Sequence, residues 1–303
     1  MGRVYSISQI VAVLLLFSVT AHPQAGQSGF AFLKMGVGGR ALSMAEAYSA
    51  IARDPSAMYY NPAALSLSKT SQLILMRREW FHDVHSEFIG ASASISKLSF
   101  GLSINSTSAN NIQLRETAGP PQGMFDARNM AIGISAAFEI DPSLSIGATG
   151  KYLYEKILID EASGVGFDFG GIYRTPWDFK LGFAVNNLGS ANELRHESSQ
   201  LPTLIRIGAA FEKDISSLEG TITLASDVVS SPDEKKTHIH IGAELDYRHA
   251  FAIRTGFQSG YESRNITTGI GLHYDAFRFD YAFVPMRYDL GATHAFSLGI
   301  TFP

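Results

Sequence analysis

Apolar residues alternate with polar or small residues from about residue 71 to the end of the chain. In the segment 277–283, one face is entirely aromatic, whereas the other carries Arg278 and Asp280. A period of two is that of a β-strand, because successive side chains of a strand point to opposite faces. About fourteen segments follow this pattern, and most are nine to eleven residues long. They span 72–80, 86–95, 98–106, 130–138, 144–154, 164–174, 179–187, 203–212, 219–228, 238–246, 249–257, 266–274, 276–284 and 294–302.

The lengths of the segments and of the links between them predict a barrel that crosses a membrane. A tilted strand of nine to eleven residues spans a bilayer. Links such as 96–97 and 175–178 are short, and they alternate with longer polar links such as 106–129 and 188–202. Transmembrane barrels have short turns at the periplasmic rim and longer loops outside, and closure leaves no strand edge unpaired in lipid. We therefore predict an all-β fold, a transmembrane antiparallel β-barrel over residues 71–303.

Composition favours this barrel over the main alternative, a water-soluble β-sandwich. Charged residues make up only 17% of the chain, against the usual quarter, while aromatic residues make up 11% and there are 28 glycines. The less apolar face of the segments is rich in Gly, Ser and Ala rather than in Lys and Glu. The chain has no cysteine, which excludes disulfides and thiolate metal sites, and its net charge of −4 gives no drive toward nucleic acid.

The first 21 residues have the features of a secretory signal peptide. Arg3 precedes an apolar run over 10–19, and Val19-Thr20-Ala21 has the small-x-small form of a cleavage site. A membrane anchor is the alternative, but a run of about ten residues is half of what a spanning helix needs. We expect residues 1–21 to be removed after Sec-type export and the mature protein to lie in the bacterial outer membrane.

Residues 22–70, which we call the hatch, differ from the barrel pattern. Gly36, Gly38 and Gly39 form a flexible run, and the pattern predicts a helix over 40–52. Asp54-Pro55 would end this helix, and Asn61-Pro62-Ala63 is a further turn. An alanine-rich helix that precedes a barrel with small inward-facing residues suits a plug inside the lumen.

The same residues carry a family resemblance. The blocks FLKMGVGGRALSMAEAY (32–48) and DPSAMYYNPAAL (54–65) resemble the N-terminal signature of the PorV/PorQ family, which belongs to the wider FadL-like outer-membrane barrels. Asn61-Pro62-Ala63 matches the hatch motif of that superfamily. This resemblance implies a barrel that binds or shuttles exported proteins or attachment-complex subunits in type IX secretion. The outer loops over 106–129, 155–163, 188–200 and 230–236 would be the contact surface.

A second function stays open, that of a FadL-like channel for the uptake of hydrophobic small molecules. In such a channel the hatch moves and the ligand leaves through a lateral opening. The modest loops of this chain, about 17 residues per strand and connection, disfavour an elaborate hydrophobic capture site. A soluble secreted enzyme is the least favoured class, since no Gly-x-Ser-x-Gly or His-Glu-x-x-His motif is present. We expect no catalytic residue and no cofactor.

Charged side chains at inward positions are the remaining candidates for a site. His238 and His240 lie two residues apart on one face of a strand, with Glu244 further along the same face. Two histidines at this spacing could bind a metal, but the sequence fixes no third ligand. We therefore predict a polar lumen wall and no metal. Charges inside a barrel generally pair with each other or with the plug, because isolated buried charges are costly. The hatch residues Arg40 and Glu46 are candidates for such pairing. The predicted lumen polar network consists of Arg40, Arg254, Arg278, Asp280, His238, His240 and Glu244; Lys151, Lys180 and Arg206 also fall on inward positions.

Overall fold

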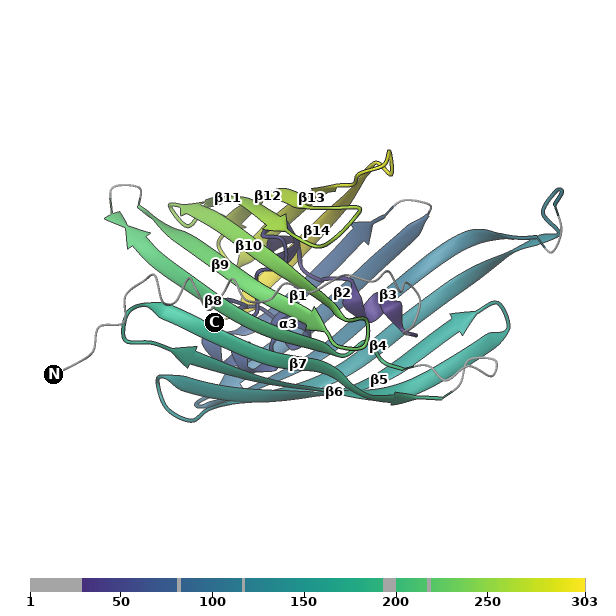
Figure 1. Cartoon of the computed structure of the whole chain (residues 1–303). Helices are drawn as coiled ribbons and strands as arrows, with labels where there is room; N and C mark the ends of the chain where they lie inside the picture. Colours follow the sequence, from purple (N-terminus) through teal and green to yellow (C-terminus); the bar gives the residue numbers. More distant parts are fainter. Residues whose placement is uncertain (1–28, 81–82, 116–117, 193–199, 217–218, 303) are drawn as a thin grey trace.

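The computed structural model describes residues 29–80, 83–115, 118–192, 200–216 and 219–302 and forms a closed antiparallel barrel (Figure 1). Each strand pairs with its neighbours in sequence, and β1 pairs with β14 from Ser71↔Phe302 to Glu79↔His294. The predicted fold class is therefore confirmed. The strands are β1 (Ser71–Glu79), β2 (Val84–Ile95), β3 (Leu98–Leu114), β4 (Gly123–Glu139), β5 (Leu144–Ile157), β6 (Asp160–Arg174), β7 (Phe179–Ala191), β8 (Leu204–Ile215), β9 (Gly220–Ser231), β10 (Lys236–Tyr247), β11 (Phe251–Gln258), β12 (Ile266–Tyr274), β13 (Phe277–Pro285) and β14 (Ala292–Phe302).

The two faces of the strands differ as the alternation predicts. On β13, Phe277 and Phe279 are 43% and 51% exposed, whereas Asp280 and Ala282 are buried in the lumen. Leu, Ile and Phe side chains are exposed in the same way on the other strands. An outer surface of this kind matches the apolar band of a membrane barrel, where a charged group near the midplane costs about 2–4 kcal/mol. No helix among the described residues has the length and apolar character needed to span a bilayer.

Several links are shorter than predicted because strands continue into them. β3 and β4 have 17 residues each, so most of the predicted loop 106–129 is a paired hairpin that extends beyond the rim (Figure 1). Likewise, only Leu158 and Ile159 separate β5 from β6 within the predicted loop 155–163. Polar residues occupy both faces of these extensions, and above a membrane a strand needs no apolar face to keep its backbone hydrogen bonds.

The remaining two predicted loops change less. In the region 188–200, β7 continues to Ala191, and residues 193–199 lie outside the described part. The loop 230–236 is reduced to 232–235. The predicted signal peptide, residues 1–21, also lies outside the described residues.

Residues 29–70 of the hatch lie inside the barrel (Figure 1). The elements of this segment are the 3-10 helices η1 (Ala31–Lys34) and η2 (Pro62–Leu67) and the short α-helices α2 (Gly39–Ser43) and α3 (Ala57–Tyr60). α2 packs against β11–β14, and η2 packs against β3–β6. Most of its apolar side chains are buried to within 3% exposure, so the interior of the barrel is a packed core formed by hatch and wall together.

The predicted helix over 40–52 is wrong. α2 ends at Ser43, and Ala45 and Glu46 adopt left-handed backbone conformations with φ of 55° and 61°. Two consecutive residues of this kind cannot continue a right-handed helix. The chain from 45 to 52 is a series of turns instead.

Polar side chains of the wall account for this departure, because they bind the backbone groups that a helix would use. Thr267 accepts a hydrogen bond from the N–H of Ala45 at 3.0 Å. Asp227 accepts the N–H groups of Tyr48 and Ser49 at 3.2 and 2.9 Å. Buried backbone groups need such partners, and here the barrel supplies them in place of a helical turn.

Candidate functional site

The Asn61-Pro62-Ala63 turn is fixed to the wall by the Asn61 side chain. Its amide nitrogen donates to the carbonyls of Ser49 and Gly171 at 2.9 and 3.1 Å, and its oxygen accepts the N–H of Ala63 at 3.1 Å as the N-cap of η2. Pro62 occupies the first turn of η2, where its missing N–H has no cost. The motif therefore joins two parts of the hatch to β6.

Glycines of the wall allow this close approach. A Cβ at Gly147 would lie 2.5 Å from the backbone nitrogen of Ala63, which is shorter than real contacts permit. A Cβ at Gly182 would lie 2.7 Å from the carbonyl oxygen of Ser49. These inward glycines thus form the surface on which the hatch sits.

The three glycines of the hatch have separate local roles. Gly36 faces the Glu46 carboxylate, and a Cβ there would lie 2.5 Å from its Oε2. Gly38 has φ +84°, a conformation that other residues rarely adopt. Gly39 donates its N–H to Ser297 of β14 at 2.7 Å.

Three arginines and three carboxylates form one chain of buried ion pairs, which we call the paired network. Arg40 donates two bonds to Glu244, at 2.6 and 2.8 Å, and Glu244 also accepts from Arg254. The members are Arg40, Glu244, Arg254, Asp280, Arg278 and Asp54. Every member pairs with another, so the network carries no net charge and its cost of burial is largely offset.

The second half of the paired network connects β11 and β13 to the hatch. Arg254 Nη1 donates to Asp280 at 2.8 Å, Arg278 Nε donates to Asp280 at 2.9 Å, and Arg278 Nη2 donates to Asp54 at 2.5 Å. Burial of Asp54 favours its protonated form, but Arg278 outweighs this effect and holds the pKa of Asp54 below its usual value. Five of the seven predicted network residues thus meet in one place. Asp54 was not predicted, since beside Pro55 it had been interpreted only as the end of a helix.

The two histidines of the predicted network lie among other partners. The ring of His238 stacks on Tyr261 with 3.9 Å between ring centroids, and His240 Nε2 lies 3.2 Å from the Tyr261 hydroxyl. Within the described ranges, no group of three or more His, Asp and Glu side chains is placed to hold a metal ion. The pair forms part of a polar and aromatic section of the lumen wall.

The remaining predicted lumen charges are also paired or stacked. Lys151 contacts Asp168 at 2.7 Å, and Lys180 pairs with Glu212. The guanidinium of Arg206 lies over the rings of Tyr59 and Tyr60 at 5.6 and 5.2 Å.

A small cavity lies between hatch and wall on the β2–β5 side. A cavity lined by Met58, Tyr59 and Phe88 together with Asn105 and Lys151 has a volume of about 20 Å³. This is roughly the space that one water molecule needs. This cavity therefore holds no solute larger than water unless the hatch moves.

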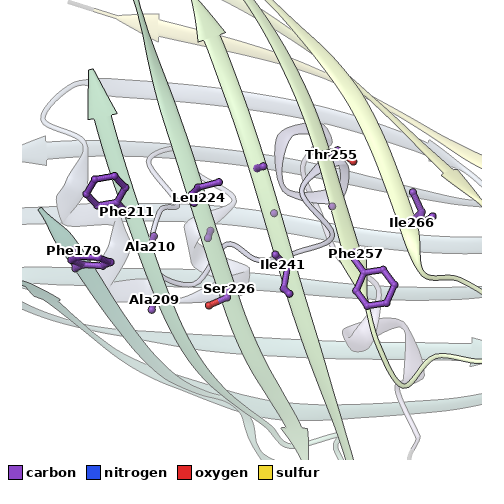
Figure 2. A pocket seen from close by; sticks show the side chains of 14 residues that line it. Phe179, Ala209, Ala210, Phe211, Leu224, Ser226, Ile241, Thr255, Phe257 and Ile266 are labelled. Atoms are coloured by element: carbon purple, nitrogen blue, oxygen red, sulfur yellow. The ribbon is translucent and has the colours of Figure 1, made fainter. Parts of the chain in front are cut away.

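A larger depression lies on the membrane face of the wall (Figure 2). It has a volume of about 660 Å³ and crosses β7–β12, where outward-facing Ala209, Ser226, Ala243 and Thr255 are small. Larger apolar side chains surround them: Phe179, Phe211, Leu224, Ile241, Phe257 and Ile266 (Figure 2). On the inner side of the same strands, Gly242 and Gly256 lie directly against the hatch turn at residues 44 and 45, so the wall is thin here.

Solved structures with the same fold include outer-membrane channels. The toluene transporter TodX of Pseudomonas putida is 13% identical, with a TM-score of 0.67 over 88% of this chain and 99% of that chain. The CymD monoaromatic hydrocarbon channel is 12% identical, with a TM-score of 0.64 over 88% and 98%. A Pseudomonas aeruginosa FadL homologue is 12% identical, with a TM-score of 0.51 over 87% and 97%. The chain thus has the FadL-like barrel fold of bacterial outer-membrane proteins.

Sequence comparison gives the family. No curated protein matches the chain. The model of the uncharacterised protein family UPF0164 matches residues 7–166, more than half of the sequence. This chain is therefore a member of the UPF0164 family.

Proposed function

We propose that this protein is a non-enzymatic outer-membrane channel for small hydrophobic molecules, and that the hatch gates its lumen. The observation that carries the proposal is a closed barrel whose interior is filled by a separate N-terminal segment held through side-chain contacts. The fold is that of TodX, a toluene transporter, and CymD, a monoaromatic hydrocarbon channel.

The arrangement of contacts supports gating by the hatch rather than by the wall. Every strand is hydrogen-bonded to both neighbours around the barrel, which makes the wall the more rigid part. The described part of the hatch, residues 29–70, contributes no strand to the wall. Polar links such as Asn61 to Gly171 and Arg278 to Asp54 can break and re-form without disturbing the sheet. A monoaromatic solute, far larger than the cavity beside Met58, would enter the lumen when these links open.

A reversible cross-link between hatch and wall tests the proposal, and the absence of cysteine makes it specific. A Cβ built at Gly90 of β2 lies 2.9 Å from Cβ of Pro55, so a shift of about 1 Å brings Gly90→Cys and Pro55→Cys to disulfide geometry. Uptake of radiolabelled toluene would be measured in cells that express the wild-type chain, the double variant and each single variant. The single variants also measure the crowding of Gly90→Cys against Phe88.

The expected result is uptake by the wild-type chain, loss of uptake in the oxidised double variant, and recovery on reduction. If the wild-type chain gives no uptake above that of cells lacking it, the channel proposal is wrong. If the oxidised double variant takes up toluene as fast as the reduced one, the channel exists but the hatch at Pro55 does not gate it.

A role in type IX secretion is the second candidate. It is supported by the PorV/PorQ-like blocks at 32–48 and 54–65, and by the β3–β4 hairpin, which extends beyond the rim and offers exposed side chains such as Met124. Chemical cross-linking on intact cells, followed by purification of the barrel, would recover secreted proteins if this function is correct. Deletion of the hairpin tip over 110–122 should then abolish their recovery and leave toluene uptake unchanged.

A further inference from the structure

Three arginines lie buried at the end of the lumen under the longer loops, and we call them the arginine cluster. Arg78 is the second-last residue of β1, Arg206 lies near the start of β8, and Arg264 belongs to the link between β11 and β12. Their exposed fractions are 0%, 2% and 8%. Guanidinium groups keep their charge in proteins, so burial of three of them needs compensation.

Aromatic rings supply part of that compensation. Arg78 lies 3.8 Å from the ring centroid of Trp80, and Arg264 lies 4.7 Å from that of Tyr261. Arg206 faces Tyr59 and Tyr60, as described above. These cation–π contacts use the faces of the guanidinium groups and leave their N–H groups, which lie in the guanidinium plane, for other partners.

Many of those N–H groups have no acceptor in the described part of the chain. Arg78 makes one long hydrogen bond, from Nη2 to Thr293 at 3.4 Å, and its Nε and Nη1 lack an acceptor there. Nε and Nη1 of Arg206 lack one as well. In the paired network, by contrast, each arginine donates to at least one carboxylate.

The carboxylates near the cluster do not balance its charge. Glu46 pairs with Arg264 at 3.4 Å. Burial alone would raise the pKa of Glu46, but the positive charge of Arg264, and after it His240, Arg206 and Arg78, lowers it below its usual value, so the charges of all three arginines act on this one carboxylate. Asp227 is also near Arg206, but its Oδ2 already accepts the N–H groups of Tyr48 and Ser49. Among the described residues, three positive charges thus have two negative ones near them.

We propose that the arginine cluster is a binding site for an oxyanion, namely the carboxylate or phosphate group of a small solute. Arg78 and Arg206 bind it through the N–H groups that have no acceptor among the described residues. The guanidinium fork matches the oxygen spacing of both groups, and the charge-assisted bonds are stronger in a site with little water. The tyrosine rings at 59, 60 and 261 give the site apolar walls that suit the body of an organic anion. This goes beyond the proposed channel, because equilibrium binding does not require transport.

Isothermal titration of the purified full-length barrel in detergent tests the proposal with three probes. Benzoate carries a carboxylate, inorganic phosphate carries the other oxyanion, and benzyl alcohol is a neutral molecule of the size of benzoate. The variants are Arg78→Gln and Arg206→Gln. Arg77→Gln is the matched control, because Arg77 is the neighbour of Arg78, faces outward, and is 55% exposed in pairs with Glu79 and Glu87.

The expected result is binding of benzoate, phosphate or both to the wild-type chain and to Arg77→Gln, with no comparable binding of benzyl alcohol. Arg78→Gln and Arg206→Gln should each weaken binding at least about tenfold, as expected for loss of a charge-assisted hydrogen bond. Which of the two anions binds identifies the group that the site accepts. Should Arg78→Gln fail to fold, Arg206→Gln alone carries the comparison.

Three results would overturn the proposal. In the first, neither anion binds to the wild-type chain, and the cluster is then only a solvated or stacked group of side chains. In the second, benzyl alcohol binds as tightly as benzoate, and the apolar walls alone are responsible. In the third, Arg77→Gln weakens binding as much as Arg78→Gln, and the weakening then reflects the loss of one positive charge anywhere on the protein rather than the loss of a contact in the site.

Discussion

Replacement of Asp280 by Asn should weaken the paired network through which the hatch is attached to the wall. Asp280 is fully buried and lies at the centre of the paired network, where it accepts from Arg254 at 2.8 Å and from Arg278 at 2.9 Å. The substitution preserves the size of the side chain and removes only the charge. Arg254, which is fully buried, and the half-buried Arg40 and Arg278 would then share two carboxylates, Glu244 and Asp54.

The magnitude follows from the complete burial of the Asp280 and Arg254 side chains, whereas Arg278 is half-buried. Removing one member of a buried ion pair costs about 3–5 kcal/mol, because the opposite charge stays behind unpaired. The amide oxygen of Asn still accepts one hydrogen bond, so we take the lower end, about 3 kcal/mol. At about 2 °C per kcal/mol for a chain of this size, the unfolding temperature should fall by about 6 °C or more.

The assay is the temperature at which the detergent-solubilised barrel changes its mobility in a gel, measured for the wild-type chain and for Asp280→Asn. Glu87→Gln is the control, because Glu87 pairs with Arg77 at 2.8 Å on the exposed face and such a pair contributes at most about 1 kcal/mol. A shift for Asp280→Asn no larger than that of Glu87→Gln would refute the idea that the paired network anchors the hatch.

Three further predictions use the same assay. The pKa of Asp54 is lowered in the folded chain, so its contribution to stability is present at neutral pH and is lost as the pH falls below about 4. The Asp54→Asn variant should therefore be less stable than the wild-type chain at pH 7, and its stability should depend less on acid. An unchanged acid sensitivity would contradict this. Gly147→Ala should lower the free energy of unfolding by about 1–3 kcal/mol, because its Cβ would meet the backbone of Ala63 at 2.5 Å. Gly171→Ala is the control and should have little effect, since its nearest contact would be at 3.9 Å. Equal effects of the two substitutions would argue against close packing of hatch and wall. Asn61→Ala leaves two buried carbonyls without their donor and should cost about 1–3 kcal/mol, and a shift within 1 °C would show that the motif is not an anchor.

The barrel was predictable because the alternation of apolar and polar side chains is set within each strand. Lipid on one side and the hatch on the other impose a period of two on every strand, and the alternation can be counted in the sequence without knowing which strands pair. The extensions of β3 and β4 were not predictable in this way, because beyond the membrane the two faces meet the same solvent, and residues 106–111 are polar or small on both faces.

The interior was predictable only as a set of inward charges. Arg254 and Asp280 lie on β11 and β13, two strands apart. Their contact depends on the length of the side chains that reach across β12, and the spacing of the two residues in the sequence does not reveal it. Of the arginine cluster, Arg206 was expected at an inward position. Arg78 could have been found from its place next to the outward Arg77, whereas Arg264 lies in a link, where alternation has no meaning.

The hatch contacts the region where the first and the last strand of the barrel pair, and this position bears on how the barrel closes. The hatch leads directly into β1 at Ser71, and its Gly39 is hydrogen-bonded to Ser297 of β14, the last strand of the chain. Pairing β1 with β14 joins segments more than 200 residues apart, which is entropically costly for a free chain. A hatch that is already docked on β14 would reduce this cost, because it keeps the last strand near the first. The same contact would favour pairing of β1 with the chain's own last strand over pairing with the exposed strand edge of a neighbouring molecule.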